Sequence, residues 1–126
     1  MSRPDMVIVD DEPDFAAFVA TVAEGMGFGV RLAESGMKLR QLYEEHRPDL
    51  VMLDIVMPDE DGIEVARWLH EAAYAGGLIL ISGHNPLYLK MAGVLRELAG
   101  ERPPVILRKP IRLAELRAAL QPWADT

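Results

Sequence analysis

Hydrophobic residues along this chain occur either in short continuous runs or in longer stretches with a helical period. Continuous apolarity over four or five residues is typical of strands buried on both faces. Short apolar runs predict strands at residues 6–9, 29–33, 50–53, 78–81 and 105–107, of which the first, third and fourth are nearly all apolar. The periodic stretches predict helices at residues 14–26, 37–46, 62–73, 86–99 and 113–120. Five strands alternating with five helices indicate an α/β fold with a doubly wound parallel sheet.

Polar residues follow the ends of four of the predicted strands. Asp10 and Asp11 follow the first strand, Asp54 the third, Ser82 the fourth, and Lys109 comes shortly after the fifth. In open α/β sheets, ligands bind outside the carboxyl ends of the strands, near the point where the strand order reverses. We therefore expect three carboxylates, one hydroxyl and one ammonium to meet at the same edge of the sheet.

Most of these residues have an ordinary structural explanation when taken alone. Asp10 and Asp11 can open a helix, where carboxylates interact favourably with the positive end of the dipole. Asp54 is different, because a carboxylate at the end of a buried strand loses hydration energy unless a cation or hydrogen-bond donors compensate for it. The acids at 59–61, by contrast, fall in an expected loop that leads into the helix at 62–73.

The chemistry of this residue set points to phosphoryl transfer. Carboxylates with room for water form an oxygen-only site that suits Mg²⁺, which usually shares its coordination sphere with phosphate. An aspartate such as Asp54 can act as a nucleophile toward phosphorus and give an acyl phosphate. The metal, Lys109 and the Ser82 hydroxyl can each take one peripheral phosphoryl oxygen.

Four segments of the chain together resemble the receiver domain of two-component response regulators. They are VDDEPD at 9–14, LDIVMPDEDG at 53–62, ISG at 81–83 and LRKPI at 107–111. The resemblance covers essentially the whole chain and implies a flavodoxin-like strand order, 2-1-3-4-5. It implies that Asp54 is the phosphoacceptor, with a phosphohistidine on a sensor histidine kinase or a histidine phosphotransfer protein as donor. It also implies Mg²⁺-dependent autophosphorylation and slow autodephosphorylation at Asp54, rather than a conventional enzyme activity.

The same resemblance assigns ligands to the metal. Asp11 and the Asp54 carboxylate would hold Mg²⁺ directly, with the backbone carbonyl of Val56 as a third ligand. Asp10 would act largely through water. Each of these assignments is an expectation carried over from the family.

The resemblance also concerns the switch that follows phosphorylation. Ser82 would be the switch hydroxyl and Lys109 the family's lysine, followed by Pro110 after a cis peptide bond. Receivers usually carry Tyr or Phe three residues before the lysine, where this chain has Ile106. An aliphatic residue cannot report the switch by ring rotation, so we hypothesise that Ser82 and residues 84–86 carry the shift.

Two further positions bear on the lifetime of the phosphoryl group. In receivers, the residues two past the phosphoacceptor and two past the switch hydroxyl border the path of the hydrolytic water, and here they are Val56 and His84. An apolar Val56 neither orients nor activates that water. The sequence therefore predicts a phosphoryl group that lasts for minutes or more.

Composition limits the partners and the compartment. The formal net charge is −7, which argues against nucleic acid as a direct partner because phosphate binding depends on clustered Lys and Arg. The chain has no cysteine, which removes disulfides, thiol nucleophiles and cysteine-ligated metals. Its apolar runs are too short for a membrane-spanning helix. We expect a cytoplasmic protein without membrane insertion.

Charge is distributed unevenly along the chain. Residues 1–83 carry 6 basic and 16 acidic side chains, whereas residues 84–126 carry 7 basic and 4 acidic ones. By resemblance, this basic part is the docking face formed by the fourth helix, fifth strand and fifth helix. We expect it to bind a downstream protein partner or to form a phosphorylation-dependent homodimer. The alternative is that these basic residues only form a solvent-exposed helix face.

The length of 126 residues predicts a single receiver domain with an ordered core at about 4–122 and no effector domain in this chain. Whether it works alone or as part of a larger regulator stays open. Two other functions also stay open: a phosphate sink or relay without output, and a pseudo-receiver that binds partners without being phosphorylated.

Overall fold

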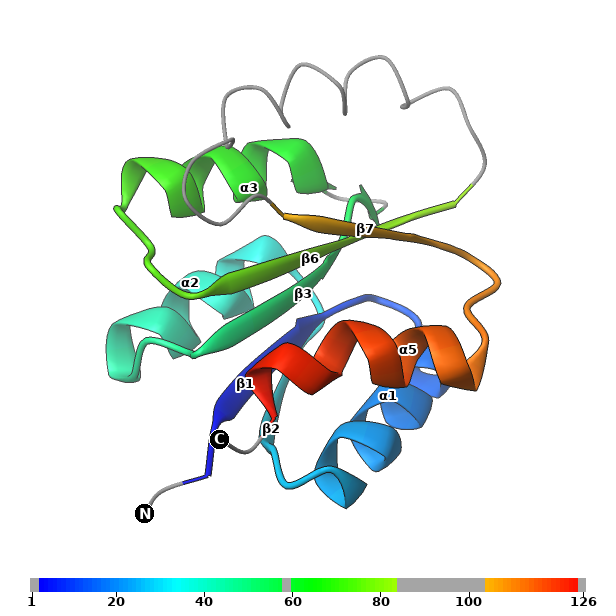
Figure 1. Ribbon diagram of the computed structural model, residues 1–126. Coiled ribbons are helices and arrows are strands. Elements are labelled where there is room, and N and C mark those ends of the chain that lie inside the picture. Colours follow the sequence, from blue (N-terminus) through cyan, green and yellow to red (C-terminus); the bar gives the residue numbers. More distant parts are fainter. Residues whose placement is uncertain (1–2, 58–59, 84–103, 125–126) are drawn as a thin grey trace.

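A five-stranded parallel sheet forms the centre of the molecule (Figure 1). The structure, a computed structural model, describes residues 3–57, 60–83 and 104–124. The sheet strands are β1 (Asp5–Val9), β2 (Gly29–Ala33), β3 (Leu50–Asp54), β6 (Gly77–Ser82) and β7 (Val105–Arg108). They are arranged in the order β2-β1-β3-β6-β7, and every neighbouring pair is parallel. Counted along the chain, the sheet strands have the order 2-1-3-4-5, which confirms the predicted fold.

Helices cover both faces of this sheet (Figure 1). On one face, α1 (Pro13–Gly25) and α5 (Leu113–Leu120) pack over one core cluster, followed by a short 3-10 helix, η1 (Gln121–Trp123). On the other face, α2 (Gly36–Glu45) and α3 (Gly62–Glu71) pack over a second cluster. Both faces of the inner strands are therefore buried, which explains their continuous apolar sequences. The helix predicted at 86–99 lies outside the described residues.

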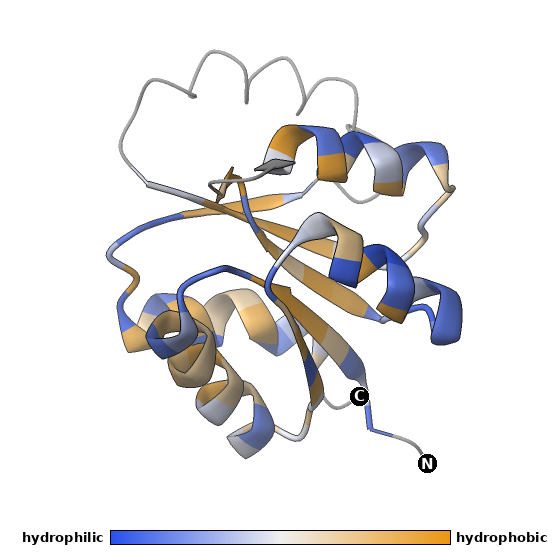
Figure 2. Ribbon diagram, turned by 180° about the vertical axis from the view of Figure 1, so that it is seen from behind, coloured by the Kyte–Doolittle hydropathy of each residue, from blue (hydrophilic) through white to orange (hydrophobic). Residues whose placement is uncertain are grey.

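The hydropathy of the elements follows this layering. In Figure 2 the strands are orange along most of their length, whereas the helices carry both orange and blue residues. All five residues of β3 are buried, including Asp54 at its end. Burial of apolar surface on both sides of β3 stabilises the strand by about 25 cal/mol per Å² of apolar area removed from water. That burial fixes the position of the strand end that carries the candidate site.

A short antiparallel pair of strands, each two residues long, follows Asp54 and was not predicted. Strands β4 (Val56–Met57) and β5 (Glu60–Asp61) pair antiparallel, and α3 begins at Gly62 immediately afterwards. The sequence analysis expected a loop at 59–61, and this expectation was wrong for residues 60–61, whereas the helix expected from residue 62 does begin there. Proline and three acids in a row are typical of loops, but the backbone at 60–61 can pair regardless of these side chains.

None of the helices in the described parts of the chain has the length and apolar character needed to cross a bilayer.

Candidate functional site

Asp54 is a buried carboxylate whose two oxygens have different partners. The residue is 3% exposed. Its Oδ1 accepts a hydrogen bond of 2.9 Å from the backbone N–H of Val56, and its Oδ2 lies 3.3 Å from Nζ of Lys109. Burial raises the pKa of Asp54, and the Val56 and Lys109 contacts offset this only partly. The side chain is therefore oriented by its neighbours and is short of compensating positive charge.

Asp10 lies beside it at the end of β1 and is 5% exposed. Its Oδ1 accepts a hydrogen bond of 2.8 Å from the Glu12 backbone N–H. Its Oδ2 is buried without a hydrogen-bond partner among the described residues and forms an ion pair of 3.5 Å with Lys109 Nζ. Burial raises the pKa of Asp10, and the negative charge of Asp54 adds to the shift. An unpartnered buried oxygen of this kind is costly and calls for a cation.

Lys109 reaches the site from just beyond β7. Its backbone N–H donates a hydrogen bond of 2.8 Å to the Ser82 carbonyl, which joins the ends of β6 and β7. Its ammonium forms an ion pair of 2.6 Å with Glu12 Oε1 and lies near Asp54 and Asp10. Burial lowers the pKa of Lys109, but the Glu12 hydrogen bond and the nearby carboxylates outweigh it, so the net pKa is raised. The peptide bond between Lys109 and Pro110 is cis, as the resemblance implies.

The carboxylates can hold a metal ion. One oxygen from each of Asp10, Glu12 and Asp54 lies within 4.8 Å of the others. Among the described residues, these three carboxylates face one ammonium, that of Lys109, so the group favours a divalent cation, and a set made only of oxygens suits Mg²⁺. The Oδ2 of Asp10, which accepts no hydrogen bond from the described residues, supplies a ligand atom. The residues present therefore fit the expected metal.

The membership of this group differs from the metal-binding residues expected from the sequence. Glu12 belongs to it and was missed, whereas Asp11 is not part of it. Asp11 is nevertheless close enough for its charge to raise the pKa of Asp54. The direct ligation by Asp11 and by the Val56 carbonyl stays a prediction. The signal for Glu12 was present in the sequence, since it follows the acid pair and precedes the first residue of α1.

The remaining predicted positions lie around this centre. Ser82 is the last residue of β6 and is partly buried. Ile106 is partly buried and packs against the core cluster under α2 and α3, so it faces the interior. The Val56 side chain is 49% exposed beside Asp54. His84 lies outside the described residues.

Comparison with known proteins identifies the family. Residues 6–121 match the family described as the response regulator receiver domain. The chain belongs to this family. A buried acidic site with a lysine is consistent with phosphoacceptor signalling.

Similar curated proteins include longer regulators. The receiver chain is 32% identical over 111 residues to the TorCAD operon transcriptional regulatory protein TorR of Escherichia coli K12, an alignment that covers 88% of this chain and 46% of TorR. It is 32% identical over 71 residues to the polar-differentiation response regulator DivK of Brucella ovis, covering 56% of this chain and 57% of DivK. The chain thus spans about half the length of these relatives.

Solved structures support the fold. A CheY-like receiver domain protein from Methanospirillum hungatei JF-1 superposes with a TM-score of 0.84 at 20% identity, over 96% of this chain and 93% of that one. The receiver domain of NtrX from Brucella abortus gives 0.81 at 23% identity, over 94% and 96%. The receiver architecture is therefore shared across most of the chain.

Proposed function

We propose that this protein is a phosphorylation-dependent signalling switch in which Asp54 accepts the phosphoryl group. One observation carries the proposal. Asp54 is a buried carboxylate at a strand end. One of its oxygens accepts a hydrogen bond from a backbone N–H, and the other lies beside a lysine ammonium. A purely structural carboxylate would be destabilised by two further acids nearby, here Asp10 and Glu12. A nucleophile that shares its site with a metal is expected to have such acids, because they bind the metal.

The proposed step transfers phosphorus from nitrogen to oxygen. A carboxylate oxygen of Asp54 attacks the phosphorus of a phosphohistidine on a sensor histidine kinase or phosphotransfer protein. The new oxygen–phosphorus bond forms as the phosphorus–nitrogen bond breaks, and the electron pair stays with the leaving imidazole nitrogen. Lys109 neutralises part of the charge on the phosphoryl oxygens, and the Ser82 hydroxyl donates to one of them.

Mg²⁺, when bound, supplies neutralisation of phosphoryl charge at this site. Asp11, Asp54 and the Val56 carbonyl are the ligands that the family resemblance implies, and Asp10 contributes through water. The buried, unpartnered Oδ2 of Asp10 supports this proposal. Glu12 adds a further carboxylate at the exposed side of the group.

The output is proposed to be a change in the basic docking face. That face includes Arg108 in β7, Arg112 at the N-cap of α5 and Arg117 within α5. A downstream protein or a second copy of the chain would bind it once Asp54 is phosphorylated. The hypothesis that Ser82 and residues 84–86 carry the shift fits the inward position of the aliphatic Ile106.

The test is phosphorylation by a small donor that carries a phosphorus–nitrogen bond. Incubation of the wild-type protein with phosphoramidate and Mg²⁺ should raise its intact mass by about 80 Da, one phosphoryl group. Asp54→Asn should show no gain. Asp14→Asn, an exposed acid in the first turn of α1, is the matched control and should behave as wild type. No gain in the wild type would favour the pseudo-receiver alternative.

A further inference from the structure

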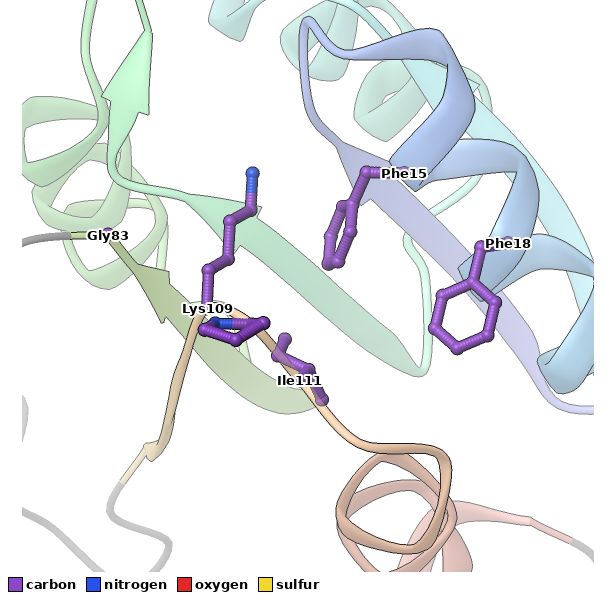
Figure 3. Close-up of a pocket in the computed structure, with 6 residues that line it drawn as sticks. Phe15, Phe18, Gly83, Lys109 and Ile111 are labelled. Atoms are coloured by element: carbon purple, nitrogen blue, oxygen red, sulfur yellow. The ribbon is translucent and has the colours of Figure 1, made fainter.

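Glu12, the N-cap residue of α1, and Phe15 in its first turn contact Lys109 from the exposed side of the site. The ammonium lies 2.6 Å from Glu12 Oε1, closer than it lies to Asp54 or Asp10. It also lies 4.4 Å from the centre of the Phe15 ring, which is within cation–π distance. Figure 3 shows Phe15 reaching from α1 toward the Lys109 side chain, while Phe18 on the same helix faces Ile111. Lys109 is thus shared between the buried acids and α1.

The two ion pairs of Lys109, with Glu12 and with Asp54, differ in strength. The Glu12 side chain is 62% exposed, so water screens its ion pair with Lys109. The Asp54 side chain is buried, where charges interact more strongly. Phosphorylation replaces the single negative charge of the Asp54 carboxylate with a phosphoryl group that carries about two, so the buried side gains about one negative charge. The Lys109 ammonium is then attracted more strongly to Asp54, and its exposed ion pair with Glu12 breaks.

We propose that Glu12 is a positioning residue that holds Lys109 partly out of the site before phosphorylation and releases it to the phosphoryl group afterwards. This inference rests on the proposed function of Asp54. Glu12 acts through Lys109 rather than on the phosphoryl group itself. Competition for the ammonium makes phosphorylation slower than the buried residues alone would allow.

The kinetic consequence is specific. Glu12→Gln removes the competing charge, so the rate constant at saturating phosphoramidate and Mg²⁺ should rise roughly two- to fivefold, the range expected for loss of an exposed ion pair. Glu12→Asp keeps the charge but shortens the side chain by one methylene, and it should behave like the glutamine variant. Asp14→Asn removes one charge from the same turn without a contact to Lys109 and should match wild type.

A second readout follows Lys109 without any phosphoryl transfer. In limiting acetic anhydride, the amine of Lys109 should be labelled less readily than that of the exposed Lys38 because of its ion pairs. Both Glu12 variants should raise the labelling of Lys109 relative to Lys38, again roughly two- to fivefold, and Asp14→Asn should not. A merely structural role of Glu12 would leave this ratio unchanged.

The outcomes separate the inference from the function on which it rests. Faster phosphorylation together with greater Lys109 labelling in both Glu12 variants supports the inference. If the wild type is phosphorylated but either readout stays at the wild-type value in Glu12→Gln, the inference alone is overturned. If the wild type is not phosphorylated at all, the proposed function fails and the inference fails with it.

Discussion

Gly62 lies directly against the peptide that joins Asp54 to Ile55. A β-carbon on Gly62 would stand 2.7 Å from the Asp54 carbonyl oxygen and 2.9 Å from the Ile55 carbonyl carbon. Both of these atoms belong to the backbone, so they cannot move aside as a flexible side chain would. Glycine therefore allows α3 to begin against the segment that carries the candidate phosphoacceptor.

Replacement of this glycine should disturb both stability and the site. We predict that Gly62→Ala lowers the free energy of unfolding by about 1–3 kcal/mol, the usual cost of overpacking, and slows phosphorylation because Asp54 is displaced. Urea unfolding and the phosphoramidate rate measure the two effects. Gly25→Ala is the control, since its β-carbon would meet nothing within 4 Å. It should be neutral or stabilising, and equal stability of the two variants would contradict the prediction.

Removal of one buried acid should stabilise the metal-free protein. The pKa of Asp10 is raised by burial, so its ionised form is disfavoured in the folded state. The stability associated with its protonated form is complete below the unfolded pKa and is lost as pH rises through the higher folded pKa, and at neutral pH the charge is a liability. We predict a higher Tm for Asp10→Asn than for wild type in EDTA. Addition of MgCl₂ should stabilise wild type and affect the variant much less.

A thermal unfolding series with and without Mg²⁺ measures both effects. Calcium at the same concentration tests whether any divalent ion suffices. A lower Tm for Asp10→Asn in EDTA would mean that the carboxylate is well compensated without a metal, contrary to its unpartnered oxygen.

Val56 offers a test of phosphoryl lifetime. Its side chain is 49% exposed next to Asp54, while its backbone N–H holds Asp54 Oδ1. Val56→Asn keeps the backbone contact and places a hydrogen-bonding group where water approaches. We predict faster decay of the phosphorylated protein, by up to about a hundredfold, the lower end of what positioned polar groups contribute. Val56→Ala is the control, and unchanged decay in the asparagine variant would count against the role of Val56.

Tyr74 makes stability fall at high pH. Its hydroxyl donates a hydrogen bond of 2.8 Å to the Gly77 carbonyl, and burial raises its pKa above the usual value. The unfolded chain releases this proton near about pH 10 while the folded state retains it, so this contribution is complete below that pH and is lost above it. Tyr74→Phe should lose about 1 kcal/mol at pH 8 and decline less steeply between pH 9 and 11, as urea unfolding would measure. Parallel pH profiles for the two proteins would rule this out.

The sequence predicted the centre of the site because it depends on strand ends. The carboxyl ends of parallel strands meet at one edge, so Asp10, Asp54 and Lys109 could be placed together before any coordinates were known. The strand order and the helices on both faces followed from the alternation of apolar runs and from the family resemblance. These features depend on patterns that recur along the chain.

Other features could not be predicted from such patterns. The contact of Glu12 with Lys109 joins residues 97 positions apart. It depends on the direction in which α1 leaves β1 and on the reach of a lysine side chain, neither of which has a sequence period. The hairpin of β4 and β5 is too short to show alternation, and its sequence of proline and acids favours a loop.

The most direct test is to identify the residue that carries the phosphoryl group. Borohydride reduces an acyl phosphate to an alcohol and leaves an ordinary carboxylate intact, so a phosphorylated aspartate is recovered as homoserine. After treatment of the wild type with phosphoramidate, Mg²⁺ and then borohydride, peptide mass spectrometry should find homoserine at position 54 only. Homoserine at Asp10 or Asp11, or its absence from position 54 in protein that has gained a phosphoryl group, would contradict the assignment of Asp54.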